Sequence, residues 1–244
     1  MKPNCPALIA MALLPLLCSA RAMAEDSIRV GALIETTEEG ERVLPPSPGH
    51  PVYYEPLALG YREMGGRLDF WQRPPPPVET VKGALIRALA GQGYQVAEGP
   101  TPASLVLVFR WGVIDPEMRP VFDHKDSAID RIEPVNGSEM LGLVVGQGWY
   151  GIYPSINSNA QEFVADLGRN DQKESRYFLI VSALDARAFA KGKQVLLWRA
   201  HVTTLYWGHY LDEVLGSMIN FSAPLFGRVT PVPQIATIPV LPLN

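Results

Sequence analysis

The stretch Tyr177–Thr204 constrains the fold more than any other part of this chain. In its first part, Tyr177–Asp185, both alternating sets of side chains are apolar, which is expected of a strand covered on both faces. A connection over residues 186–193, in which Gly192 supplies backbone freedom, leads to a second apolar run, Val195–Thr204. The spacing predicts two adjacent antiparallel strands, so that Asp185 is a turn residue and not a catalytic one.

The second strand of this pair has two different faces. Its apolar face holds Leu196, Trp198, Ala200 and Val202, and its polar face holds Arg199, His201 and Thr203 together with Val195 and Leu197. This alternation is typical of a half-exposed strand. We therefore expect Trp198 to anchor the core, and we expect Arg199 and His201 to lie on the outer face.

Three further segments have strand character. Ser27–Glu35 and Ser104–Val113 are rich in aliphatic residues, and in the latter Leu105, Leu107, Phe109 and Trp111 share one face. Val52–Tyr61 contains Pro56, which suits the edge of a sheet better than its centre. Between them, residues 36–51 hold four prolines and two glycines and predict an exposed loop. Residues 139–146 fit either a buried strand or a short helix.

Helical spacing occurs in two clear segments and one short one. Apolar residues recur at helical intervals after the proline run 74–77 (Val78, Val81, Leu85 and Leu89) and again near the end of the chain (Leu211, Val214, Leu215, Met218 and Ile219). A shorter helix is predicted over Ser158–Gly168. A proline run directly before a helix is most simply its extended lead-in, although such a run is also a ligand type for partner domains.

The pattern of elements predicts an α+β fold. We expect a single domain over residues 25–227, with a mainly antiparallel sheet and a few helices packed on it. A cleaved signal peptide over residues 1–24 precedes it. Residues 228–244 form a proline-rich C-terminal tail, uncharged from Thr230 to Asn244 and either loose or laid along the domain.

The first 24 residues have the three parts of a secretory signal peptide. Lys2 supplies a positive charge, Ala7–Cys18 is an apolar segment of 12 residues, and Ala22-Met23-Ala24 fits the cleavage site of a signal peptidase. A membrane span needs about 20 apolar residues. We expect a periplasmic or secreted protein that starts at Glu25. Cleavage after Ala22 and lipid attachment at Cys18 are alternatives.

Cleavage changes the composition of the chain. The mature chain keeps 19 basic and 25 acidic residues and loses both cysteines, Cys5 and Cys18. Its core must therefore stabilise it without disulfides. The acidic balance argues against a nucleic-acid partner, and no second apolar stretch approaches the length of a membrane span.

Motifs for cofactors are weak in this sequence. The glycine pattern of a dinucleotide site occurs at Gly146–Gly151, but Pro154 interrupts the helix that such a site requires. Asp123–Asp126 includes His124, yet none of the histidines (His50, His124, His201 and His209) has a second His or Cys at ligand spacing. We expect no cofactor, no metal site and no catalytic residue that the sequence alone can identify.

Other chemistry is equally unmarked. The chain has no G-x-S-x-G motif, and Ser138 and Ser182 have no evident base beside them. Asp115 and Glu117 follow a predicted strand end, where a carboxylate pair for hydrolysis can occur, and a turn explains them equally well. Aromatic residues gather in two segments (Trp149, Tyr150 and Tyr153; Tyr206, Trp207 and Tyr210). They suit either a binding surface or small cores under loops.

Several pieces of the chain together resemble a known class of proteins. They are "VKGALIRALAGQGYQV", "SLVLVFRWG", "FLIVSALDA", "GKQVLLWRAHV" and "APLFG", within residues 78–227 and around a long central insertion. The chain is similar in these pieces to uncharacterised bacterial exported proteins, often lipoproteins, of domain-of-unknown-function type. The resemblance implies a small α+β envelope protein; the two leucines before Cys18 depart from the lipoprotein pattern.

The sequence therefore favours a non-catalytic domain of the cell envelope. Such a domain would bind an envelope protein or a surface component. A metal-independent hydrolase that uses carboxylates and a structural subunit of an envelope assembly are the alternatives.

Overall fold

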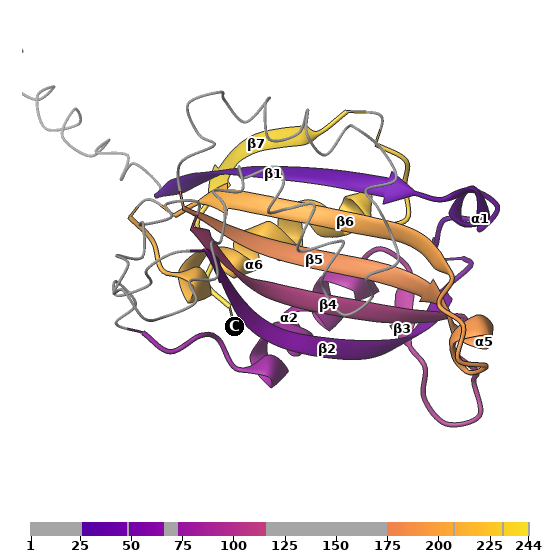
Figure 1. Cartoon of the computed structure of the whole chain (residues 1–244). Helices are drawn as coiled ribbons and strands as arrows, with labels where there is room; N and C mark the ends of the chain where they lie inside the picture. Colours follow the sequence, from indigo (N-terminus) through magenta and orange to yellow (C-terminus); the bar gives the residue numbers. More distant parts are fainter. Residues whose placement is uncertain are drawn as a thin grey trace, which may run out of the picture.

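The computed structural model describes residues 26–47, 49–65, 73–115, 175–206, 208–230 and 232–243. Within these ranges the chain forms one seven-stranded mixed sheet with the strand order β3-β2-β4-β5-β6-β1-β7 (Figure 1). The strands are β1 (Ser27–Thr36), β2 (Val52–Gly65), β3 (Tyr94–Val96), β4 (Leu105–Asp115), β5 (Arg176–Asp185), β6 (Leu196–Leu205) and β7 (Gln234–Pro239). The α+β fold predicted from the sequence is confirmed.

Most neighbouring strands run antiparallel. The pairs β4–β5, β5–β6, β6–β1 and β1–β7 are antiparallel, and β2 pairs in parallel with both β3 and β4. Parallel neighbours require a crossover connection, which α2 (Val78–Ala90) provides between β2 and β3. β3 pairs only with Val52–Tyr54, so β2 is the edge of the described sheet at Pro56, as that proline predicts.

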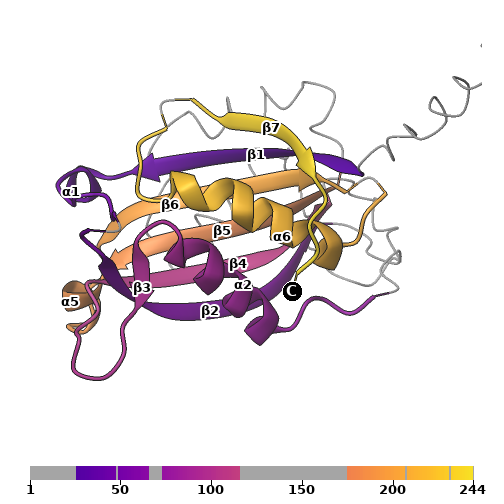
Figure 2. The same cartoon turned by 180° about the vertical axis from the view of Figure 1, so that it is seen from behind.

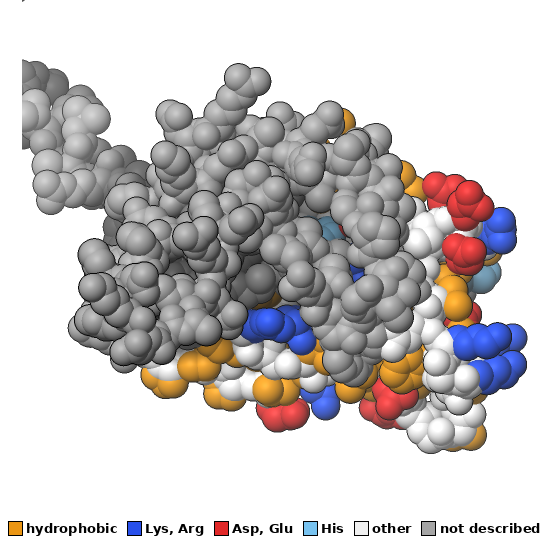
Figure 3. Space-filling model, viewed as in Figure 1, with side chains coloured by type: hydrophobic (Ala, Val, Ile, Leu, Met, Phe, Trp, Pro, Cys, Tyr) orange, Lys and Arg blue, Asp and Glu red, His pale blue; other side chains and the backbone are white. Residues whose placement is uncertain are grey.

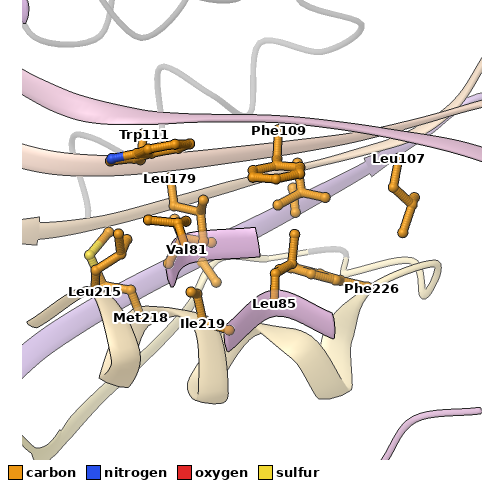
Figure 4. Packing of buried hydrophobic residues seen from close by; sticks show 14 of the residues in the cluster. Val81, Leu85, Leu107, Phe109, Trp111, Leu179, Leu215, Met218, Ile219 and Phe226 are labelled. Carbon is orange, nitrogen blue, oxygen red and sulfur yellow. The ribbon is translucent and has the colours of Figure 1, made fainter. Parts of the chain in front are cut away.

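The helices α2 and α6 (Leu211–Ser222) lie on one face of the sheet (Figure 2). The core lies between this face and the two helices, where alternate residues of β4 meet both helices (Figure 4). The residues predicted to face the core from α6 are all buried, as are Val81, Leu85 and Leu89 of α2. Val78 differs from its prediction: it is exposed because it lies in the first turn, directly after the extended Pro77.

The antiparallel strand pair predicted over Tyr177–Thr204 is present as β5 and β6. Asp185 ends β5 and caps the short helix α5 (Ala186–Phe189), because its carboxylate accepts a hydrogen bond of 2.6 Å from the Ala188 amide. Trp198 is buried and stacks on Phe226 with 5.3 Å between ring centroids. The roles predicted for Asp185 and Trp198 are confirmed.

One prediction about β6 is wrong. Its polar face is buried rather than exposed, with Arg199 at 6 %, His201 at 3 % and Thr203 at 1 % exposure. Leu197 also turns to the core, because the register of β6 against β5 shifts between Ala183 and Leu184.

Two segments predicted as irregular contain regular structure. The loop 36–51 includes α1 (Glu38–Glu41), which begins at Thr37, whose hydroxyl accepts from the Gly40 amide. The tail 228–244 is laid along the domain: β7 pairs with β1 from Gln234 to Pro239. Prolines at the end of an edge strand are compatible with pairing on one side only. The predicted elements at 139–146 and 158–168 lie outside the described residues.

Candidate functional site

The sheet face opposite the helices carries a row of paired polar side chains. His201 on β6 and Glu35 on β1 meet at 3.0 Å between Nε2 and Oε2, and both side chains are almost fully buried. Two residues before His201 in β6, on the same face, the Arg199 Nε donates to the Ser182 hydroxyl at 3.0 Å. The Thr203 hydroxyl donates to the Tyr177 carbonyl at 3.0 Å. These bonds explain how a polar strand face can be buried.

Among the described residues, the side chains of this row form hydrogen bonds within the sheet. His201 and Glu35 resemble the base and orienting acid of a catalytic triad, which would need a hydroxyl bonded to the histidine. The Ser182 hydroxyl, which lies on the same sheet face, instead accepts a hydrogen bond from Arg199. Ser182 is thus a partner of Arg199 within the sheet, and no local sequence pattern predicts either pairing.

A shallow hollow lies where the proline run meets the start of α6. It is lined by Tyr61, Arg73, Pro74, Pro75, Pro76, Tyr210, Leu211 and Asp212. The Arg73 guanidinium lies over the Tyr210 ring at 3.8 Å from its centroid and contacts Glu213 at 2.9 Å. These contacts join the proline run to α6 within one chain, which supports its role as a lead-in to α2.

Glu213 also stabilises the helix that carries it. Its carboxylate accepts a hydrogen bond of 3.0 Å from the Tyr210 amide at the first turn of α6. This bond, with smaller contributions from Arg73 and His209, lowers the pKa of Glu213 from its ordinary value. Asp212, the acid among the described residues that line the hollow, lies 3.8 Å from the Arg73 guanidinium.

Four large apolar side chains that are exposed in the described part of the chain lie towards one end of the sheet, where β1 ends. Leu44 is 83 % exposed, Val229 59 %, Val232 58 % and Val43 40 %. Val43 and Leu44 follow α1, and the other two lie in the loop before β7; both views place this loop and α1 at the same end of the sheet (Figures 1 and 2). We call these four residues the aliphatic end. Large exposed aliphatic side chains in one region are typical of interaction surfaces.

Hydrogen bonds hold both loops of the aliphatic end on the sheet. The Thr37 amide and hydroxyl donate to the carbonyls of Leu197 and Leu196, at 2.9 and 2.8 Å. The Thr230 hydroxyl accepts from the Ile34 amide at 2.9 Å and donates to the Ile34 carbonyl at 3.3 Å. The exposed side chains are therefore carried on anchored backbone, which lowers the entropy cost of binding.

The aliphatic end has an acidic neighbour. Glu38, Glu39 and Glu41 lie in α1, directly before Val43, whereas Arg42 follows α1 and Arg228 directly precedes Val229. Arg42 reaches Glu38 at 3.9 Å. A partner with apolar side chains and a basic rim would complement this surface.

The remaining residues considered from the sequence are dispersed. His209 lies near Asp26 and Glu213, at 3.4 and 3.9 Å, and its carbonyl accepts from the Tyr177 hydroxyl. His50 forms an isolated bridge with Ser47, and no cluster of three metal-ligating side chains occurs among the described residues. Tyr206 packs edge-on against Tyr177, as a core residue does.

Several candidates lie outside what the structure describes. They are the signal peptide with Cys5 and Cys18, the glycine pattern at 146–151, His124, Glu117, Ser138, Trp149, Tyr150, Tyr153 and Trp207, together with the side chain of Asp115. No helix within the described ranges combines the length and the apolar character that crossing a membrane requires.

No family model and no curated protein matches this sequence. Among solved structures, the chain is similar to the PelC dodecamer from Paraburkholderia phytofirmans, at 12–13 % identity in two crystal forms. The similarity covers 80 % of this chain and 96 % of that chain, with TM-scores of 0.35 and 0.34. It is also similar to a PDZ domain protein from Parabacteroides distasonis, with 10 % identity, 82 % and 36 % covered, and a TM-score of 0.36. At these identities and TM-scores the likenesses carry no argument about function.

Proposed function

We propose that this chain is an exported, non-catalytic interaction domain of the cell envelope that binds a protein partner through the aliphatic end. The observation that carries the proposal is the exposure of Val43, Leu44, Val229 and Val232 on two loops that are hydrogen-bonded to the sheet. Burying about 100 Å² of such a side chain contributes roughly 2.5 kcal/mol to association. Exposed apolar residues grouped in one region are typical of protein interaction sites.

The partner should present apolar side chains surrounded by lysine or arginine. The apolar part follows from the four aliphatic residues, and the basic rim follows from the three glutamates of α1. Export is supported by Lys2, the apolar segment Ala7–Cys18 and the small residues that end at Ala24. Cleavage there would release the domain to the periplasm or the medium, where such a partner would meet it.

Site-specific photo-crosslinking in the producing cell tests this proposal. A photoreactive residue is placed at Leu44 or at Val232, and the control position is Glu79, whose side chain is 82 % exposed on α2. We expect adducts of one defined mass from positions 44 and 232 and none from position 79. Mass spectrometry should identify an apolar crosslinked peptide flanked by basic residues. The same adducts at all three positions, or none at 44 and 232, would contradict the proposal.

A further inference from the structure

Two arginines lie side by side on the sheet face opposite the helices. Arg110 on β4 is paired with Gly60 of β2, and Arg62 of β2 is paired with Gly112 of β4. Both side chains point away from the helices, because Tyr61 and Trp111, which alternate with them, pack in the core. Diagonal neighbours on one sheet face lie about 7–8 Å apart. Figure 3 shows basic side chains over the region where Figure 1 places β4 and β2.

Glycine occupies the position beside each arginine. At Gly60 a Cβ atom would meet no atom of the described residues within 4 Å. At Gly112 a Cβ atom would collide with the Arg62 backbone, so that glycine allows β2 to approach β4 closely. The register thus places the two arginines diagonally on one sheet face, each with a glycine as its direct cross-strand neighbour.

The two positive charges are not neutralised by the described part of the chain. None of its ion pairs includes Arg62 or Arg110, although Arg42, Arg73, Lys82 and two histidines all have acidic partners there. Arg110 is half-buried, and its burial, together with the charge of Arg62, lowers its pKa. Holding two like charges together in a partly desolvated place costs free energy, and such costs are typical of binding sites.

We propose that Arg62 and Arg110 form a binding site for a phosphate group. Each guanidinium presents a planar fork of N–H donors that matches phosphate oxygens, and two of them match the charge of a dianionic phosphate. This site lies on the sheet face, away from the aliphatic end, and does not depend on the proposed protein partner. The phosphate belongs either to a small soluble molecule or to a lipid headgroup.

Titration of the purified mature protein with inorganic phosphate tests the site. We expect phosphate to raise the melting temperature at low salt, with a dissociation constant that Arg62→Gln and Arg110→Gln each weaken at least tenfold. The matched control is Arg187→Gln, which removes an exposed arginine of α5 and should leave binding unchanged. The proposal would be overturned if the wild type and both variants bound phosphate equally, or if the control lost as much affinity as the two variants. It would also be overturned if phosphate at 10 mM, roughly the weakest affinity that counts as a site, had no effect.

A second measurement separates a site from a structural pair. Without phosphate, Arg110→Gln should leave the melting temperature unchanged or raise it, because the substitution removes the repulsion from Arg62. A fall in the melting temperature of the folded variant would show that Arg110 has a stabilising partner, and would overturn the proposal. Co-sedimentation with phosphatidic acid vesicles, with phosphatidylcholine vesicles as control, distinguishes the two sources. Binding to the former that Arg62→Gln and Arg110→Gln both weaken identifies a headgroup, and binding to neither kind of vesicle identifies a soluble phosphate.

Discussion

His201 Nε2 lies 3.0 Å from Glu35 Oε2, and both side chains are about 96–97 % buried between β6 and β1. The two residues do not face each other directly in the register, where His201 is opposite Leu33 and Arg199 is opposite Glu35. The bond is therefore diagonal and joins successive polar positions of the same sheet face. It fixes the register of β1, the strand that also pairs with the C-terminal β7.

Replacing either member of this pair should destabilise the fold. Glu35→Leu or His201→Leu alone leaves the other polar group buried without this partner, at a cost of about 1–3 kcal/mol. The double variant should be more stable than the sum of the single effects predicts, with a coupling energy of about 0.5–3 kcal/mol. Urea unfolding of the four proteins measures this cycle. Additive effects would show that the two side chains do not interact in solution.

Trp198 should be among the most sensitive core positions. It stacks on Phe226 and lies against Tyr94, so that Trp198→Ala leaves a cavity between β6 and the end of α6. We expect a loss of about 3–5 kcal/mol in the free energy of unfolding. Val229→Ala, at an exposed position, should change it by less than about 0.5 kcal/mol. A melting temperature unaffected by Trp198→Ala would mean that the faces of β6 are reversed.

The protein should lose stability above pH 10. Burial raises the pKa of Tyr54 to about 12 and also raises the pKa values of Tyr94 and Tyr177. Below pH 10 the three tyrosine hydroxyls stay protonated in the folded and in the unfolded protein. As the pH rises from 10 towards 12, the unfolded chain releases these protons and the folded chain keeps them. Stability is therefore complete below pH 10 and falls above it. Unfolding free energies at pH 8–12, with tyrosinate absorbance, measure this.

Tyr54→Phe isolates one contribution to this pH dependence. The Tyr54 hydroxyl is buried without a hydrogen-bond partner in the described structure, so the substitution should not destabilise the protein at pH 7. It should reduce the loss of stability between pH 10 and 12. An unchanged alkaline profile would show that Tyr54 ionises as freely in the folded state as in the unfolded state.

The exported protein should begin at Glu25 and respond to no reductant. Signal peptidase cleavage after Ala24 removes Cys5 and Cys18, so the mature chain has no thiol or disulfide. Intact mass and N-terminal sequencing of protein from the envelope fraction test this. A diacylated Cys18 would contradict it, and so would a melting temperature that reductant changes.

The sequence predicted the elements that have a regular apolar pattern. The faces of β4, the buried β5, Trp198 and the apolar stripe of α6 all follow from alternation or helical spacing, because one side of each element packs in a large core. β3 was missed because three residues carry no periodic signal. β7 was left open as an extended tail, because its pairing with β1 comes from residues more than 190 positions away.

The candidate sites could not be predicted because they depend on pairing between distant segments. Arg199 and His201 indicate an exposed face until Ser182 and Glu35 are known to lie beside them. Arg62 and Arg110 are brought together only by the parallel register of β2 and β4. Likewise, the loop before β7 is held against β1 by the bond between Thr230 and Ile34. Each of these relationships is a consequence of sheet topology, which a single sequence does not encode locally.

The most direct test of the aliphatic end is the size of the species that contains the protein in a gentle envelope extract. We expect the wild type to elute well above the mass of a single chain, and the Leu44→Glu, Val232→Glu double variant to elute as one chain with an unchanged melting temperature. Val78→Glu, a matched change of an exposed valine on α2, should elute as the wild type does. Elution of the double variant together with the wild type would contradict the account.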